Sequence, residues 1–115
     1  MNVSKELVRG SLVPIVLKLI DERPMYGYEI VKLVNTRTNG VLEWKEGTLY
    51  PTLHKLEADG LLKGEWRDAP SVSGEESARQ RKYYLITRAG RAELKERTGE
   101  WAAFSNAVGL LLNHP

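Results

Sequence analysis

Residues 47–62 read GTLYPTLHKLEADGLL, and no other stretch says as much about the architecture of this chain. Leu49, Leu53 and Leu56 fall at i, i+4 and i+7, which places them on one face of a helix. Gly60 stands where a helix C-cap favours a positive φ, so a short helix is predicted to end there. The other face combines hydrogen-bonding side chains with little bulk, which suits the major groove of DNA. Its residues are Thr48, Pro51, His54, Lys55 and Ala58, with Tyr50 on the flank. Taken alone, the stretch favours a plain surface helix that closes a small core.

The composition limits the class of protein. A chain of 115 residues with 42% hydrophobic and 28% charged residues is typical of one soluble globular domain. No apolar run approaches the ~20 residues needed to span a bilayer. There is no cysteine for disulfides or thiolate metal sites. We therefore expect a cytoplasmic protein that does not enter the membrane. The net charge of +2 permits nucleic-acid binding without arguing for it.

Two further helices are predicted before this stretch. Ser4 can cap the first one, over residues 4–22, and Pro14 should kink it. The second, over residues 26–38, is closed by Asn39-Gly40. Three short helices joined by such turns resemble a helix-turn-helix core.

Two strands follow, over residues 61–67 and 81–86, because aromatic and branched residues are frequent there. The run Asp68–Gln80 between them contains Pro, Ser and Gly and is predicted to be a mobile loop. Helix, strand, loop and strand in this order are typical of a winged helix. Arg79, Arg81 and Lys82 lie at the return of the loop, whereas Glu75-Glu76 lies near its tip. We therefore expect phosphate contact from the return strand and not from the tip.

The last predicted helix runs from Thr87 to about Asn113. Its seam of apolar residues is spaced 7, 3, 4 and 3 and comprises Leu94, Trp101, Phe104, Val108 and Leu111. We expect this seam to meet a second copy of the chain, although packing across the first helix of the same chain is the alternative and both can hold. The predicted architecture is mostly α with a small β-hairpin. Residues 1–87 form a winged helix-turn-helix DNA-binding domain, and residues 88–115 form a dimerisation helix that packs with the first helix.

Four blocks of sequence, in this order, resemble the PadR-type transcriptional regulators, a family that includes phenolic-acid-response and multidrug-response repressors. The blocks are LVRGSL at 7–12, MYGYEI at 25–30, GTLYP at 47–51 with the residues up to Leu61, and RKYYLIT at 81–87 with Gly90. The resemblance runs from about residue 5 to about residue 112. The single C-terminal helix places the chain with the short subfamily.

The resemblance implies a homodimer that binds a twofold double-stranded DNA operator and represses a nearby gene until an effector lowers its DNA affinity. The family's DNA-binding positions correspond here to Tyr26, Thr48, Tyr50, Pro51, His54, Lys55, Lys63, Arg81 and Lys82. Tyr26 has an alternative role, in packing with Ile30. The wing loop is longer and more acidic than the common glycine-rich form, which argues against contact at its tip.

Trp101 is a candidate ligand contact. In the multidrug-sensing members of the family that this chain resembles, a tryptophan on the terminal helix lines a pore between subunits and stacks on flat drugs. Trp101 lies at the matching point, with Phe104 one turn away. This implies a planar aromatic effector held by these two residues through offset stacking. The alternative is that Trp101 is an ordinary anchor of the dimer interface.

The sequence gives little support to an enzyme. There are two histidines, and no spacing indicates a metal site, a glycine-rich phosphate loop or a paired acid and nucleophile. We therefore expect no catalytic residues, cofactor or metal. A second alternative is a winged-helix protein-interaction module without sequence-specific DNA binding. The small net charge favours this alternative, whereas the helix face with Thr48, His54 and Lys55 argues against it. The favoured hypothesis is a sequence-specific DNA-binding regulator, a repressor released by a small-molecule effector.

Overall fold

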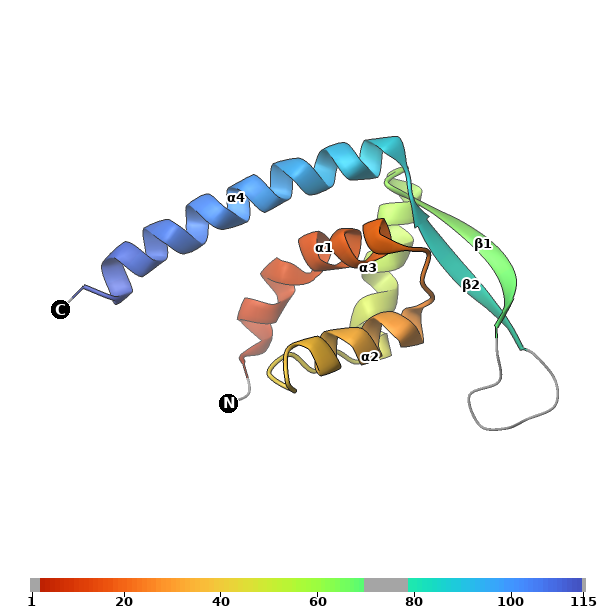
Figure 1. Ribbon diagram of the computed structural model, residues 1–115, viewed down its shortest axis with the longest axis horizontal. Coiled ribbons are helices and arrows are strands. Elements are labelled where there is room, and N and C mark those ends of the chain that lie inside the picture. Colours follow the sequence, from red (N-terminus) through yellow and green to blue (C-terminus); the bar gives the residue numbers. More distant parts are fainter. Residues whose placement is uncertain (1–2, 70–78, 115) are drawn as a thin grey trace.

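Helices and one β-hairpin make up the structure, a computed structural model that describes residues 3–69 and 79–114. The elements are α1 (Lys5–Glu22), α2 (Gly27–Arg37), α3 (Glu46–Ala58), β1 (Leu62–Ala69), β2 (Arg79–Ile86) and α4 (Arg88–Leu112). Figure 1 shows α1, α2 and α3 gathered into one body, with the hairpin on one side and α4 extending away. The prediction of a mostly helical fold with a small hairpin is confirmed.

The hairpin is longer than the sequence predicted. The two antiparallel strands pair from Leu62 opposite Ile86 to Ala69 opposite Arg79, so each strand gains two residues on the side of the loop. Backbone pairing supports this extension, and residue composition does not reveal it. The interior of the predicted mobile loop, with Glu75-Glu76, lies outside the described residues.

The core lies around the second half of α1. Val16 and Leu17 are fully buried there, and the stripe of Leu49, Leu53 and Leu56 on α3 is buried as the spacing predicted. Further core side chains come from the other elements and include Ile30, Val34, Trp44, Leu62, Tyr84 and Leu94. Ser4 caps α1 by accepting a bond from the Leu7 N–H at 3.5 Å, and Pro14 lies inside this helix, which Figure 1 shows to be bent.

The turn between α1 and α2 is attached to the hairpin. The Met25 N–H donates to the Tyr84 carbonyl at 3.3 Å, and the Tyr84 N–H donates to the Met25 carbonyl at 2.8 Å. Met25 and Tyr84 are both almost completely buried. This bridge fixes the start of α2 against β2.

The end of α3 sets the start of α4. Gly60 has a φ of +76°, and the N–H groups of Gly60 and Leu61 donate to the carbonyls of Glu57 and Leu56 at 3.0 and 2.9 Å, which is a Schellman cap. The Leu61 carbonyl then accepts from Thr87, whose hydroxyl caps α4 by accepting from the Gly90 N–H at 3.0 Å. A Cβ at Gly90 would collide with the Leu61 carbonyl, so only glycine allows this close approach. The direction of α4 is thereby fixed relative to α3.

The two halves of α4 differ. The first half packs on α1, where Leu94 is only 9% exposed and Arg91 pairs with Asp21 at 3.3 Å. The second half projects from the body (Figure 1). No described helix combines the length and the apolar character required to cross a membrane.

Candidate nucleic-acid interface

The outer face of α3 is exposed where the sequence predicted. Thr48, Pro51, His54 and Lys55 all face solvent while the three leucines face the core. Lys55 pairs loosely with Asp59, with 3.4 Å between its Nζ and the carboxylate, and its side chain is 77% exposed. Such an exposed pair contributes little to stability, so Lys55 is available for a phosphate or a base.

Tyr50 lies at the junction of α3 and α2. A Cβ at Gly27 would come within 3.0 Å of the Tyr50 hydroxyl oxygen, so the glycine lets the N-terminal end of α2 rest against this ring. Partial burial raises the pKa of Tyr50, the carboxylate of Glu46 raises it further, and Arg81 lowers it. The phenol therefore keeps its proton at neutral pH and can donate a hydrogen bond.

Two tyrosines and two arginines form a stacked series between α2 and the hairpin. The rings of Tyr26 and Tyr83 meet edge to face, with 5.2 Å between centroids. The guanidinium of Arg81 lies 5.6 Å from the Tyr26 ring centroid, and that of Arg67 lies 5.5 Å from the Tyr83 centroid. Cation–π contacts of this kind hold long arginine side chains in fixed directions. Tyr26 itself is only 9% exposed, so most of its ring is used in this packing.

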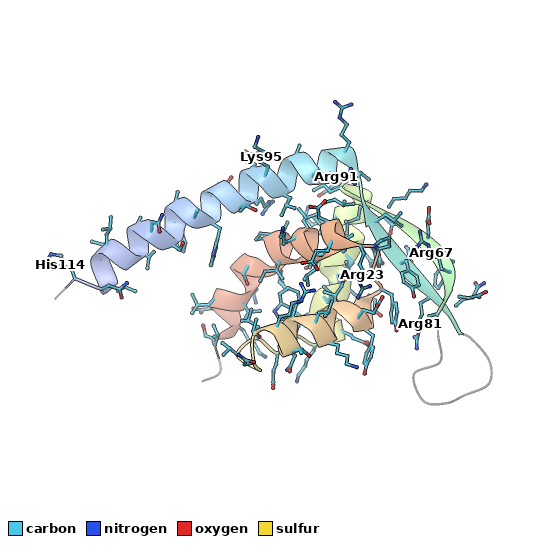
Figure 2. The ribbon with its side chains drawn as sticks, viewed as in Figure 1. Arg23, Arg67, Arg81, Arg91, Lys95 and His114 are labelled. Carbon is cyan, nitrogen blue, oxygen red and sulfur yellow. The ribbon has the colours of Figure 1, made fainter. Side chains whose placement is uncertain are left out.

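The cations of the hairpin differ in their partners. Lys63 and Arg67 both pair with Glu65, at 3.6 and 2.9 Å, and Lys82 pairs with Glu57 on α3 at 2.8 Å. Within residues 3–69 and 79–114, Arg81 has no carboxylate at ion-pair distance. Figure 2 shows Arg67 and Arg81 on the hairpin, far from Lys95 on α4. Among Lys63, Arg67, Arg81 and Lys82, Arg81 is therefore the cation that no carboxylate of the described residues holds.

Sequence reasoning missed Glu57, Arg67 and Tyr83 as members of this region. Their contacts join residues on different elements, as in the Lys82–Glu57 pair, which spans 25 positions in the sequence. Helical or strand periodicity reports which face a residue occupies, but it does not report which other element covers that face. The one usable signal was the alternation along residues 81–84, which puts Arg81 and Tyr83 on the face opposite to Lys82 and Tyr84.

Comparison with known proteins identifies the family. Residues 16–96 match the family described as "Transcriptional regulator PadR-like family", which is more than half of the chain. The chain belongs to the PadR-like family of transcriptional regulators. It is 37% identical to an uncharacterized protein of Lysinibacillus sphaericus over 110 residues, which cover 96% of this chain and 95% of that protein. This PadR-like family is one of transcriptional regulators and not of enzymes.

Solved structures of PadR-type and other transcriptional regulators share the fold. A transcriptional regulator from Clostridium thermocellum is similar with a TM-score of 0.81 and 32% identity, covering 96% of this chain and 98% of that one. A PadR family transcriptional regulator from Eggerthella lenta is similar with a TM-score of 0.77 and 36% identity, covering 96% and 88%. The hairpin and α3 described above therefore correspond to the wing and third helix of a PadR-like winged helix.

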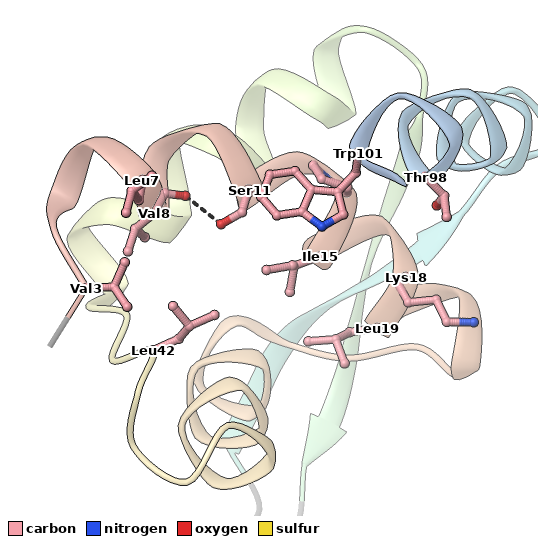
Figure 3. Close-up of a pocket in the computed structure, with 11 residues that line it drawn as sticks. Val3, Leu7, Val8, Ser11, Ile15, Lys18, Leu19, Leu42, Thr98 and Trp101 are labelled. Carbon is pink, nitrogen blue, oxygen red and sulfur yellow. Dashed lines mark hydrogen bonds between the residues drawn. The ribbon is translucent and has the colours of Figure 1, made fainter. Parts of the chain in front are cut away.

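A groove lies between α1 and α4 of this PadR-like chain. It has a volume of about 540 Å³, and its walls are mostly apolar. Figure 3 shows the Trp101 indole entering it from α4, beside Ser11 and above Ile15 of α1. Trp101 also borders a second hollow of about 320 Å³, which Pro14 and Phe104 line as well.

The predicted seam of α4 is divided between the core and solvent. Leu94 belongs to the core of its own chain, whereas Trp101, Phe104 and Leu111 are 47%, 58% and 80% exposed. Val108 is half-buried. Within the described part of the chain, no three His, Asp or Glu side chains are grouped so as to hold a metal ion.

Proposed function

We propose that this PadR-like regulator is a homodimeric repressor that binds a twofold-symmetric operator through α3 and the hairpin. The observation that carries this proposal is the α3 face, on which Thr48, His54 and Lys55 are exposed together on a helix whose other face is buried. Arg81 and Lys63 on the hairpin flank it and can reach phosphates of the same duplex. Tyr26, Tyr50 and Pro51 complete the proposed contact region, in which Tyr50 can donate from its phenol. In this proposal residues 1–87 bind DNA and residues 88–115 mediate dimerisation.

The proposed dimer rests on uncovered apolar surface. Phe104, Leu110 and Leu111 on α4 are largely exposed, and so is Leu7 beside the groove on α1. Several large exposed apolar side chains on one helix favour an interaction site. A second copy related by a twofold axis would bury both regions at once, and a twofold protein calls for a twofold operator.

The proposed effector is a planar aromatic molecule beside Trp101. The groove supports this because it is apolar, is open in the isolated chain and has an indole in its wall. Stacking on the indole would add about 0.5–1.5 kcal/mol beyond the burial of apolar area. Since α1 also carries the core on which α3 rests, an effector there is positioned to alter DNA affinity.

The test is selection of a duplex from a random-sequence library, followed by titration of its affinity against salt. We expect the recovered sequence to be twofold-symmetric and log K to fall steeply with log salt, with a slope of about −0.9 for each neutralised phosphate. Arg81→Ala should flatten the slope by about one unit. Lys95→Ala, which removes a cation from the outer side of α4, is the matched control and should leave it unchanged. A chain with no selected sequence and no salt slope would instead be a protein-interaction module.

A further inference from the structure

One ion pair connects α3 to the hairpin. Lys82 Nζ donates a hydrogen bond of 2.8 Å to Glu57 Oε1, and the two side chains are only 30% and 32% exposed. The same ammonium lies 5.5 Å from the ring centroid of Tyr84, which is 1% exposed. The pair therefore lies where the hairpin enters the core, immediately behind the outer face of α3.

Gly64 on β1 makes room for this pair. Its backbone N–H helps to lower the pKa of Glu57, and a Cβ at this position would collide with the Lys82 side chain and lie 2.7 Å from Glu57 Oε2. Gly64 is opposite Tyr84 in the strand register, so β1, β2 and α3 all meet at this point. Three elements are thus joined by one carboxylate.

We propose that Glu57, Lys82 and Gly64 form a clamp that fixes the angle between α3 and the hairpin, so that Lys82 is a positioning residue for DNA recognition and not a phosphate contact. This inference rests on the proposed DNA-binding function. Specific binding requires α3 in the groove and the hairpin on the backbone at the same time, whereas non-specific binding requires only phosphate contact. A change in the angle therefore weakens operator binding and leaves random-sequence binding intact.

The pKa shifts of Glu57 and Lys82 agree with a positioning role for this ion pair. The bond from Lys82 holds the pKa of Glu57 below its ordinary value, and the bond to Glu57 holds the pKa of Lys82 above its own. Both groups are charged at neutral pH and each is satisfied by the other. A lysine engaged in this way would have to give up a carboxylate before it could bind a phosphate.

The experiment compares the selected duplex with a random-sequence duplex for three variants: Glu57→Gln, Lys82→Met and Gly64→Ala. We expect each variant to lower the operator-to-random affinity ratio by about fivefold, the size of one partly exposed ion pair. The salt slope should stay at the wild-type value in all three. Gly64→Ala changes no charge, so its effect is free of any change in attraction to DNA. The double variant Glu57→Gln/Lys82→Met should lose no more than either single variant.

Opposite results identify Lys82 as a phosphate contact. In that case Lys82→Met flattens the salt slope by about one unit and weakens binding to both duplexes alike. Glu57→Gln then releases the lysine and strengthens binding to both duplexes. A ratio that stays at the wild-type value in folded Glu57→Gln, Lys82→Met and Gly64→Ala also overturns the proposal.

A matched control and a reversal complete the design. Glu93→Gln makes the same chemical change in the Glu93–Arg97 pair of α4, at 2.8 Å, and should leave ratio and slope unchanged. Glu57→Lys/Lys82→Glu restores an ion pair with the two charges exchanged. It should recover part of the operator-to-random affinity ratio that the single variants lose. If the wild-type chain itself shows a salt slope but no preference for any duplex, the proposed operator function fails. A preference retained in full by all three variants overturns only the clamp.

Discussion

At the α3–hairpin end of the molecule, large polar side chains are held by partners from the same chain, whereas in the far half of α4 several large apolar side chains are mostly exposed. Arg81 lies over Tyr26, and Lys82 is paired with Glu57. In contrast, Phe104 and Leu111 are 58% and 80% exposed. The first end is ordered by contacts within the chain, whereas the second presents apolar side chains to solvent. We infer that ordering for recognition is complete in a single chain and that the far half of α4 is the surface available for association.

The largest expected effect comes from charging the uncovered end. In Val108→Glu/Leu111→Glu, dimer formation would bury two charges without partners, at a cost of several kcal/mol. We expect a folded monomer by sedimentation velocity and circular dichroism, because Leu111 contributes little to the core of its own chain. Operator binding should fall with the loss of the dimer.

Asn106→Glu is the matched control for this change. It adds one negative charge, against two in the double variant, on the opposite side of α4 and should leave the wild-type oligomeric state in place. A double variant that sediments as a stable dimer would rule out the α4 seam as the interface.

The next effect concerns base reading by α3. His54→Ala and Lys55→Ala should each weaken operator binding and relax specificity at one base position by about 1–3 kcal/mol. Repeating the selection from a random library with each variant measures which position is relaxed. If changes at Thr48, His54 and Lys55 all preserve the operator-to-random ratio, another element reads the sequence.

A third effect links the two ends through Trp101. A planar dye that stacks on this indole should quench its emission and lower operator affinity by about 1–3 kcal/mol, as coupling between two sites usually does. Trp66→Phe is a suitable background, because Trp66 is 67% exposed on the hairpin and would otherwise add to the signal. Trp44 is 4% exposed in the core, so it is better kept than replaced.

The readout for the dye has its own control. Trp101→Phe should abolish the quenching while DNA binding without dye is retained. A panel of planar dyes that leaves both emission and operator affinity unchanged would leave Trp101 as an interface anchor alone.

The sequence predicted the parts of this structure that depend on one element at a time. Periodicity identified the leucine stripe of α3, and the requirement for positive φ located the end of that helix at Gly60. The contacts between elements were missed, since Glu57 reads in isolation as an ordinary helix glutamate and Lys82 as a free cation. Leu94 shows the same limit in α4, because spacing placed it on the seam, but its contact with the core depends on how α4 crosses α1.

The smallest expected effect is on the pH dependence of stability, and it tests whether the α3–hairpin end is held by charge. The bond from Lys82 lowers the pKa of Glu57 below its ordinary value of 4.5, and attraction between the charges and the Gly64 N–H lower it further, while burial opposes the shift. A lowered pKa in the folded state means that the carboxylate stabilises the fold above pH 4.5 and loses this contribution as the pH falls through the folded-state pKa. The pKa of Lys82 is raised from 10.5, so its contribution persists below pH 10.5 and is lost as the pH rises through the folded-state value.

The free energy of unfolding of wild type should therefore exceed that of Glu57→Gln by up to about 1 kcal/mol, the scale of a partly exposed pair. This difference in free energy of unfolding should be constant between pH 4.5 and pH 10.5, the ordinary pKa values of Glu57 and Lys82, and should become smaller below and above that range. Urea unfolding at a series of pH values and one protein concentration measures it, and in a Lys82→Met background the pH-dependent part of the difference should be strongly reduced. A difference that is independent of pH, or equal in the two backgrounds, would mean that Glu57 stabilises the junction by packing and not by its charge.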